Sequence, residues 1–257
     1  MKLTTALLSI LAAAMIAASP APALAQGGGE ATKPAMQPAQ TKPVQNDQPA
    51  TGDKPKTDEK PADKSAKEEP KLVYVKMKTS EGDIVIELNQ EKAPITVKNF
   101  LSYVDKKFYD GTIFHRVIST FVLQGGGFTE DYEQKMTDKP IKNEWQNGLK
   151  NVRGSLSMAR TMEPDSATSQ FFINVKDNPD LDKGGPRYGG AAYAVFGRVV
   201  SGMDVVDKIR DMPTGTKKFK NGQMMQDVPQ KNVVIQSVTR MTADEVKNVK
   251  TDSAEKR

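Results

Sequence analysis

The stretch that decides the fold is Phe114-His115-Arg116-Val117-Ile118, followed after two residues by Phe121-Val122-Leu123-Gln124-Gly125-Gly126-Gly127-Phe128. Aromatic and β-branched residues dominate it, so we predict two short strands, at Thr112–Ile118 and Phe121–Gln124. The three glycines lack the spacing and the Lys-Ser/Thr pair of a phosphate-binding loop. We therefore expect Gly125–Gly127 to allow close packing or a turn at a strand end.

Further β patterns lie on both sides of this stretch. An alternating run that begins at Leu72 and another from Ile84 to Leu88 flank Glu81-Gly82-Asp83, which is typical of a β-hairpin. Downstream, short apolar runs predict four more strands, at Ser155–Arg160, Phe171–Val175, Ala194–Val200 and Asn232–Met241.

Two segments have the apolar spacing of helices. Pro94 suits a first helical turn, and apolar residues from Val97 to Val104 follow it on one helical face. Met203–Arg210 predicts a second, shorter helix. About eight short strands and two helices indicate a mainly-β domain, either a closed barrel or a sandwich with helices at its open ends. Periodicity does not choose between these two.

Composition excludes several classes of chemistry. The 257 residues include no cysteine and one histidine, His115, so disulfides, thiolate nucleophiles and His-rich zinc sites are impossible. A Ser-His-Asp triad would need only one histidine and stays open. The 37 basic and 32 acidic residues are interspersed, with a net charge of +5. We expect a mixed-charge surface, no nucleic-acid partner, no metal and no other cofactor.

Residues 1–25 have the pattern of a secretory signal peptide. Lys2 precedes an uncharged apolar run from Leu7 to Ala18, and Ala23-Leu24-Ala25 fits a small-x-small cleavage site. The run is shorter than the roughly 20 apolar residues of a comfortable membrane span, although an uncleaved anchor is the alternative. We expect an exported protein, periplasmic or secreted, with no stable membrane insertion after cleavage.

The next segment, residues 26–70, has low complexity. It is rich in Pro, Lys, Ala, Asp, Glu and Gln and has almost no large apolar residues, so it cannot bury enough surface to fold. We interpret it as a disordered linker, either a passive spacer or a tether. The folded domain is expected at residues 71–241, followed by a charged flexible tail at 242–257.

More motifs follow the opening stretch in a fixed order. They are Gly154-Ser155-Leu156-Ser157-Met158-Ala159-Arg160, Ser169-Gln170-Phe171-Phe172-Ile173 and Val195-Phe196-Gly197-Arg198-Val199. Together the motifs resemble the cyclophilin family of peptidyl-prolyl cis-trans isomerases, over about Leu72 to Met241, and Lys142-Asn143-Glu144 resembles its bacterial branch. The resemblance implies an eight-stranded antiparallel closed barrel capped by two α-helices. It also implies catalysed rotation about X-Pro bonds.

The resemblance further implies a set of site residues. The catalytic positions carry Arg116, as the catalytic arginine, with Phe121, Gln124 and Phe172. The substrate-binding positions carry Val122, Ala159, Arg160, Gln170, Leu181 and Tyr193. Among these sets, the residues that match the proline pocket are Phe121, Val122, Phe172 and Leu181. Those that match contacts with the substrate backbone are Gln124, Ala159 and Arg160.

Some positions depart from the family pattern. Asp180 stands where the family often has an aromatic residue at the pocket rim, and Tyr193 stands where many eukaryotic members have histidine. The glycine-rich segment Asp182–Ala192 is longer than in compact members. These departures leave the isomerase core in place and predict weak binding of cyclosporin, the family inhibitor. His115 neighbours Arg116 but is expected on the opposite strand face, in a structural role.

The function expected is that of a monomeric folding enzyme that isomerises X-Pro bonds in exported, proline-containing polypeptides. The alternative is a non-catalytic chaperone module that binds proline-containing peptides. The presence of Arg116, Phe121, Gln124 and Phe172 together favours the enzyme, because a replaced arginine would have favoured the module.

Overall fold

The structure is a computed structural model that describes residues 71–249. The segments expected to be a signal peptide and a linker, residues 1–25 and 26–70, lie outside the described residues, as does the end of the tail, 250–257. The segments expected to carry the folded domain are all described.

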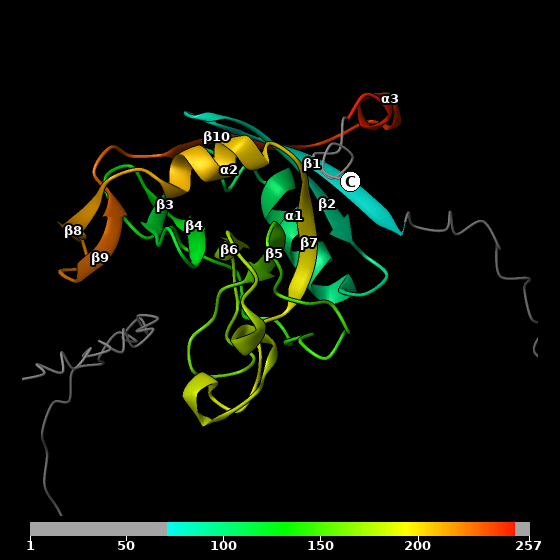
Figure 1. The fold of residues 1–257 in the computed structure, drawn as a ribbon, viewed down its shortest axis with the longest axis horizontal. Coiled ribbons are helices and arrows are strands. Elements are labelled where there is room, and N and C mark those ends of the chain that lie inside the picture. The colour runs from blue at the N-terminus through cyan, green and yellow to red at the C-terminus, as the bar shows by residue number, and fades with distance from the viewer. Residues whose placement is uncertain (1–70, 250–257) are drawn as a thin grey trace, which may run out of the picture. The chain divides into compact units, whose positions relative to one another are not determined.

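Eight antiparallel strands close into a barrel in the order β1-β10-β3-β4-β6-β5-β7-β2 (Figure 1). Their bounds are β1 Leu72–Thr79, β2 Gly82–Asn89, β3 Thr112–Val117, β4 Val122–Thr129, β5 Ser155–Met158, β6 Phe171–Asn174, β7 Val195–Ser201 and β10 Val234–Arg240. Closure leaves none of these eight strands with an unpaired edge. The barrel is therefore confirmed over the sandwich, and each of its strands overlaps a predicted one. The end predicted for β4 was wrong, because the strand continues through Gly125–Gly127 to Thr129.

The β1–β2 hairpin shows why the alternating pattern folds in this way. Val75 pairs with Ile86 and Met77 pairs with Ile84, and all four side chains are fully buried. Directly paired residues share one face of a sheet, so the apolar half of each strand enters the core that fills the barrel.

Two helices bury their apolar faces in the same core. They are α1, Pro94–Asp105, and α2, Met203–Arg210. At the start of α1 the backbone N–H groups of Ile95 and Thr96 donate to the carboxylate of Glu144, at 3.0 and 2.8 Å. A carboxylate at a helix N-terminus satisfies unpaired N–H groups and complements the helix dipole. Both predicted helices are confirmed.

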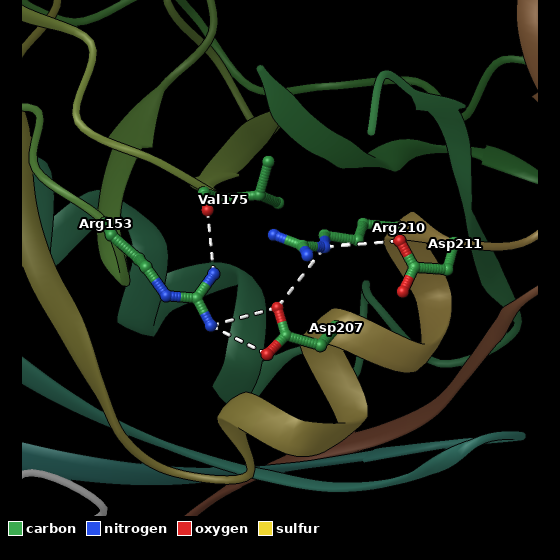
Figure 2. A network of polar contacts seen from close by, with 5 residues as sticks. All are labelled: Arg153, Val175, Asp207, Arg210 and Asp211. Atoms are coloured by element: carbon green, nitrogen blue, oxygen red, sulfur yellow. Dashed lines mark hydrogen bonds and ion pairs between the residues drawn. The ribbon is translucent and has the colours of Figure 1, made fainter. Parts of the chain in front are cut away.

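An arginine network fastens α2 to the barrel, as Figure 2 shows. Arg153, which precedes β5, donates to the carbonyl of Val175 at 2.7 Å and to both carboxylate oxygens of Asp207 on α2, at 2.9 and 2.7 Å. Arg210 lies 3.4 Å from Asp207 and 3.3 Å from Asp211. One side chain thus joins α2 to the segments that flank β5 and β6.

A second, two-stranded sheet was not expected. It pairs β8, Thr214–Lys218, with β9, Met224–Pro229, in a region where the sequence analysis placed no element. β8 is polar, and the apolar residues of β9 do not alternate with polar ones, so neither strand has the period of a half-buried strand. The Asn221-Gly222 pair between them is a common turn signal and could have located this hairpin.

Three short helices were also missed. The segment before β7 contains the 3-10 helices η1, Pro179–Asp182, and η2, Pro186–Tyr188. The tail, which was expected to be frayed, begins with α3, Ala243–Lys247. Thr242 and Glu245 form a reciprocal capping box at its start, which supplies the partners that a short helix needs.

Candidate active site

Three of the expected site residues lie in one row across adjacent strands. Arg116 on β3 pairs with Gln124 on β4, and Gln124 pairs with Phe172 on β6. Their sequence neighbours Leu123 and Ile173 are fully buried in the barrel core. Because side chains alternate along a strand, the row lies on the opposite, outer face.

The row borders a small pocket with an apolar base. A buried cluster separate from the barrel core forms this base, and Phe121 and Tyr188 pack against it, partly exposed. The lining residues are Arg116, Phe121, Val122, Gln124, Ala159, Phe172, Leu181, Tyr188 and Tyr193. All the expected site residues except Arg160 and Gln170 are therefore brought together, and Tyr188 joins them without having been expected.

Arg116 has few partners of its own. Its side chain is 19% exposed, and its Nε lies 3.9 Å from a carboxylate oxygen of Asp227. Within residues 71–249 its guanidinium donates no hydrogen bond. Burial lowers the pKa of Arg116 from its usual value, and the charge of Asp227 opposes that shift. An arginine pKa lies so far above neutrality that the group stays charged and keeps its N–H donors available.

Gln170 supports Gln124 from outside the pocket lining. The Nε2 of Gln124 donates to the Oε1 of Gln170 at 3.0 Å. Gly127 makes room for this partner, because a Cβ there would lie 2.6 Å from the Cγ of Gln170. The side chain of Gln124 is thus oriented while its own carbonyl oxygen accepts no hydrogen bond in the described part of the chain.

His115 is a buried, neutral neighbour of the site. Its ring lies 4.7 Å from the ring of Phe128, and burial lowers its pKa from 6.5 to about 3. It does not line the pocket. Burial outside the pocket agrees with the structural role expected of His115. Alternation alone does not fix the strand face of His115, because the register with β4 shifts between Phe114 and Arg116.

Arg160 differs most from its expected role. Only 3% of the residue is exposed, and its guanidinium lies over the ring of Tyr193, 4.6 Å from the centroid. It donates to backbone carbonyls of the protein itself, those of Thr161, Tyr188, Ala191 and Ala192. All but the carbonyl of Thr161 belong to the segment Asp182–Ala192, here called the pocket loop, so this loop binds donors that had been expected to contact substrate.

The comparisons with known proteins agree with this geometry. The protein-family model described as cyclophilin type peptidyl-prolyl cis-trans isomerase/CLD matches residues 74–240. The chain belongs to the cyclophilin family. The matched segment begins in β1 and ends in β10, so it contains the barrel, both core helices and every residue that lines the pocket.

Individual cyclophilins cover most of the same segment. Peptidyl-prolyl cis-trans isomerase A of Dickeya dadantii is 56% identical over 164 residues, which are 64% of this chain and 82% of that protein. Isomerase B of Escherichia coli is 57% identical over 161 residues, 63% of this chain and 95% of that protein. A solved cyclophilin-type isomerase of Cryptosporidium parvum matches with a TM-score of 0.53 and 26% identity, over 66% of this chain and 98% of that chain. This cyclophilin is a peptidyl-prolyl cis-trans isomerase.

Buried asparagine side chains hold the side of the cyclophilin pocket that Phe121 and Leu181 form. The side chain of Asn178 donates to the carbonyl of Phe121 at 3.0 Å, and the N–H of Leu181 donates to the carbonyl of Asn178 at 2.9 Å. Asn151 donates to Asp182 from both its backbone and its side chain, at 2.8 Å each. Fully partnered buried polar groups of this kind rigidify their surroundings, so the pocket wall is fixed from behind.

Tyr188 is the lining residue that sequence reasoning missed. It lies in η2 of the pocket loop, and its ring packs edge-on against Tyr193, with centroids 5.9 Å apart. An aromatic residue inside a glycine-rich loop is a candidate ligand contact, and this signal could have found it. Among residues 71–249 no cluster of histidine and acidic residues could hold a metal ion, and no helix has the length and apolarity to span a membrane.

Proposed function

We propose that this cyclophilin twists X-Pro bonds with Arg116 as the principal donor, and that it does so in exported proteins. Rotation about a peptide bond crosses a barrier of about 18–20 kcal/mol, because resonance gives the C–N bond double-bond character. No covalent bond has to break. Binding the twisted amide more tightly than either planar isomer is therefore sufficient for catalysis.

Arg116 fits the role of donor to the twisted amide. A twisted prolyl nitrogen regains its lone pair and can accept a hydrogen bond, which a planar amide nitrogen cannot. Arginine offers a permanent charge and planar, fixed N–H groups. In the part of the chain that the structure describes, those groups donate to no other residue. This uncommitted guanidinium beside an apolar pocket is the observation that carries the proposal.

The rest of the pocket serves to hold one side of the bond still. We assign the proline ring to the apolar surface of Phe121, Val122, Phe172 and Leu181, which line the same pocket as Arg116. Gln124, oriented by Gln170, is placed to bind a backbone group of the substrate. Fixing one side in an apolar site lets the other side rotate and strengthens the hydrogen bond from the arginine.

A prolyl-isomerisation assay on a short peptide separates this mechanism from simple peptide binding. Arg116→Ala should lower kcat/KM by about 10²-fold or more, because one charged donor is lost from the transition state. The affinity for the ground-state peptide should fall much less, since the key hydrogen bond forms mainly in the twisted state. Near-normal turnover by Arg116→Ala would instead favour a binding module that holds proline-containing segments.

The proposal of export rests on the pattern of residues 1–25, which resembles a cleavable signal. Expression in a bacterium with a periplasm, followed by fractionation and N-terminal sequencing, tests it directly. The mature protein should begin at or near Gln26 and be recovered outside the cytoplasm. Recovery of an intact Met1 terminus in the membrane fraction would contradict export in this form.

A further inference from the structure

The unexpected β8–β9 hairpin brings a carboxylate to Arg116. Asp227 on β9 places an oxygen 3.9 Å from the Nε of Arg116. Asp227 does not line the pocket itself, and its side chain is 41% exposed. The carboxylate therefore meets the guanidinium at its Nε edge, from outside the substrate pocket.

The backbone at Asp227 is held in an unfavourable conformation. Its φ is +61°, in the left-handed region where most residues other than glycine are strained. Aspartate tolerates this region better than most residues, yet a strained non-glycine residue persists only where its surroundings enforce it. The pairing of β8 with β9 is irregular here, with a register shift between Gly215 and Lys217. The strain thus falls on the residue that faces Arg116.

Packing fixes the hairpin against the strand that carries Arg116. Val228, which follows Asp227, is fully buried in one cluster with Ile113 of β3 and Phe128 of β4. The ring of Phe219, between β8 and β9, lies 4.8 Å from that of Phe128. These contacts hold the hairpin against β3 and β4, and thereby hold the carboxylate beside the guanidinium.

We propose that Asp227 is a positioning residue for Arg116. An anion at the Nε edge restricts rotation of the guanidinium and leaves the terminal N–H groups for the prolyl nitrogen. Within residues 71–249 Asp227 is the carboxylate that pairs with Arg116, so no second acid substitutes for it there. The inference rests on the proposed role of Arg116 as the donor to the twisted amide.

The test compares Asp227→Asn and Asp227→Gly in the full chain. Both remove the charge, while glycine also accepts a positive φ without strain. We expect kcat/KM to fall about three- to fivefold in both variants, the range of a partly exposed ion pair, with the loss mainly in kcat. The unfolding midpoint of Asp227→Gly should not fall, because relief of strain offsets the lost ion pair.

Glu133→Gln is the matched control. Glu133 forms an exposed ion pair with Lys220 at the tip of the same hairpin, at 3.0 Å, and lies outside the pocket lining. The kcat/KM of Glu133→Gln should match that of the unmodified chain. The inference is overturned if Asp227→Asn and Asp227→Gly are as active as Glu133→Gln, or if their losses appear only in KM. If Arg116→Ala keeps its activity, the proposed role of Arg116 is wrong. If Arg116→Ala loses activity and the Asp227 variants do not, only the role proposed for Asp227 is wrong.

Discussion

Arg116 and Gln124 lie directly opposite each other across the pairing of β3 and β4. Their side chains therefore leave the sheet on the same face, beside Phe172 on the next strand. The donor proposed for the twisted amide and the group proposed to hold the peptide backbone are thus spaced by sheet hydrogen bonding. A site built on paired strands keeps its geometry more precisely than one built on loops.

Replacing Arg116 by lysine should lose most of the activity although the charge is kept. A lysine ammonium is a point charge on a flexible stem and lacks the planar set of N–H donors. We expect kcat/KM of Arg116→Lys to fall by at least about tenfold, between the unmodified chain and Arg116→Ala. Peptide-isomerisation kinetics measure this directly. Full activity in Arg116→Lys would show that charge alone is enough.

The buried His115 should make stability depend on pH. Burial lowers its pKa from 6.5 to about 3, so between these values the unfolded chain binds a proton that the folded chain does not. Stability is then present above the unfolded pKa and is lost as pH falls toward the folded one. From about pH 7 to about pH 5.5 we expect the free energy of unfolding to drop by about 1 kcal/mol. Urea unfolding of untagged protein measures this.

The variant His115→Gln serves as the control for that measurement. The chain has one histidine, and carboxylates are fully ionised over most of this interval, so the pH-dependent loss should disappear in the variant. The isomerisation rate of the unmodified chain should stay flat from about pH 6 to about pH 9, because arginine does not titrate there. A step in the rate near pH 6.5 would give His115 a part in catalysis.

Arg160→Met should loosen the pocket loop. The substitution keeps the buried stem but removes the donors to the carbonyls of Thr161, Tyr188, Ala191 and Ala192. We expect faster tryptic cleavage after Lys183 and Arg187, with a KM raised about threefold or more as Tyr188 leaves the wall. Arg153→Met, which loses comparable side-chain bonds to Val175 and Asp207 but none to the loop, should leave the cleavage rate and the KM unchanged. Equal cleavage in the two variants would indicate general destabilisation.

The domain at residues 71–241 should fold and work alone. The barrel is closed by β1 and β10, whose ends lie inside this segment, so we expect kcat/KM within about twofold of the full chain. A shorter version that ends at Ser237 removes the buried Val238, which pairs with Met77, and should not fold. Failure of the longer version would show that residues outside it stabilise the domain.

Cyclosporin should inhibit this cyclophilin weakly. Asp180 at the expected pocket rim is paired with Lys183 at 3.0 Å, and the hydrogen bond from Lys183 lowers the pKa of Asp180, so its charge is present at neutral pH. Covering that charge with an apolar ligand costs desolvation. Asp180→Trp should tighten inhibition by about tenfold or more. Inhibition of Asp180→Asn should be stronger than that of the unmodified chain and weaker than that of Asp180→Trp. Strong inhibition of the unmodified chain would contradict this reasoning.

Much of the fold could be predicted because the barrel strands carry their own signals. Pairs such as Val75–Ile86 alternate with outward residues, and α1 follows Pro94 with apolar residues at helical spacing. The β8–β9 hairpin carries no such pattern. It is held by a few contacts, chiefly those of Phe219 and Val228 with β3 and β4, and tertiary contacts of that kind are not visible in sequence periodicity.

The limits of prediction at the site have a similar cause. Residues on paired strands, such as Arg116 and Gln124, occupy positions that the motifs define. The partners of Arg160 lie in the pocket loop, whose length departs from the family pattern, so no motif indicates where its backbone carbonyls point. Asp227 meets Arg116 only because a separate hairpin packs on β3. Contacts between distant segments of irregular structure escape reasoning from local sequence.

The anchoring of the pocket loop by Arg160 has a consequence for adapting the enzyme. The row of Arg116, Gln124 and Phe172 belongs to the sheet, whereas Tyr188 reaches the pocket from a loop whose carbonyls bind the buried Arg160. Loops tolerate changes in length and sequence better than paired strands do. If the row is catalytic, as proposed, a grafted loop that keeps the carbonyls bound by Arg160 should redirect the enzyme to other peptides and leave the row intact.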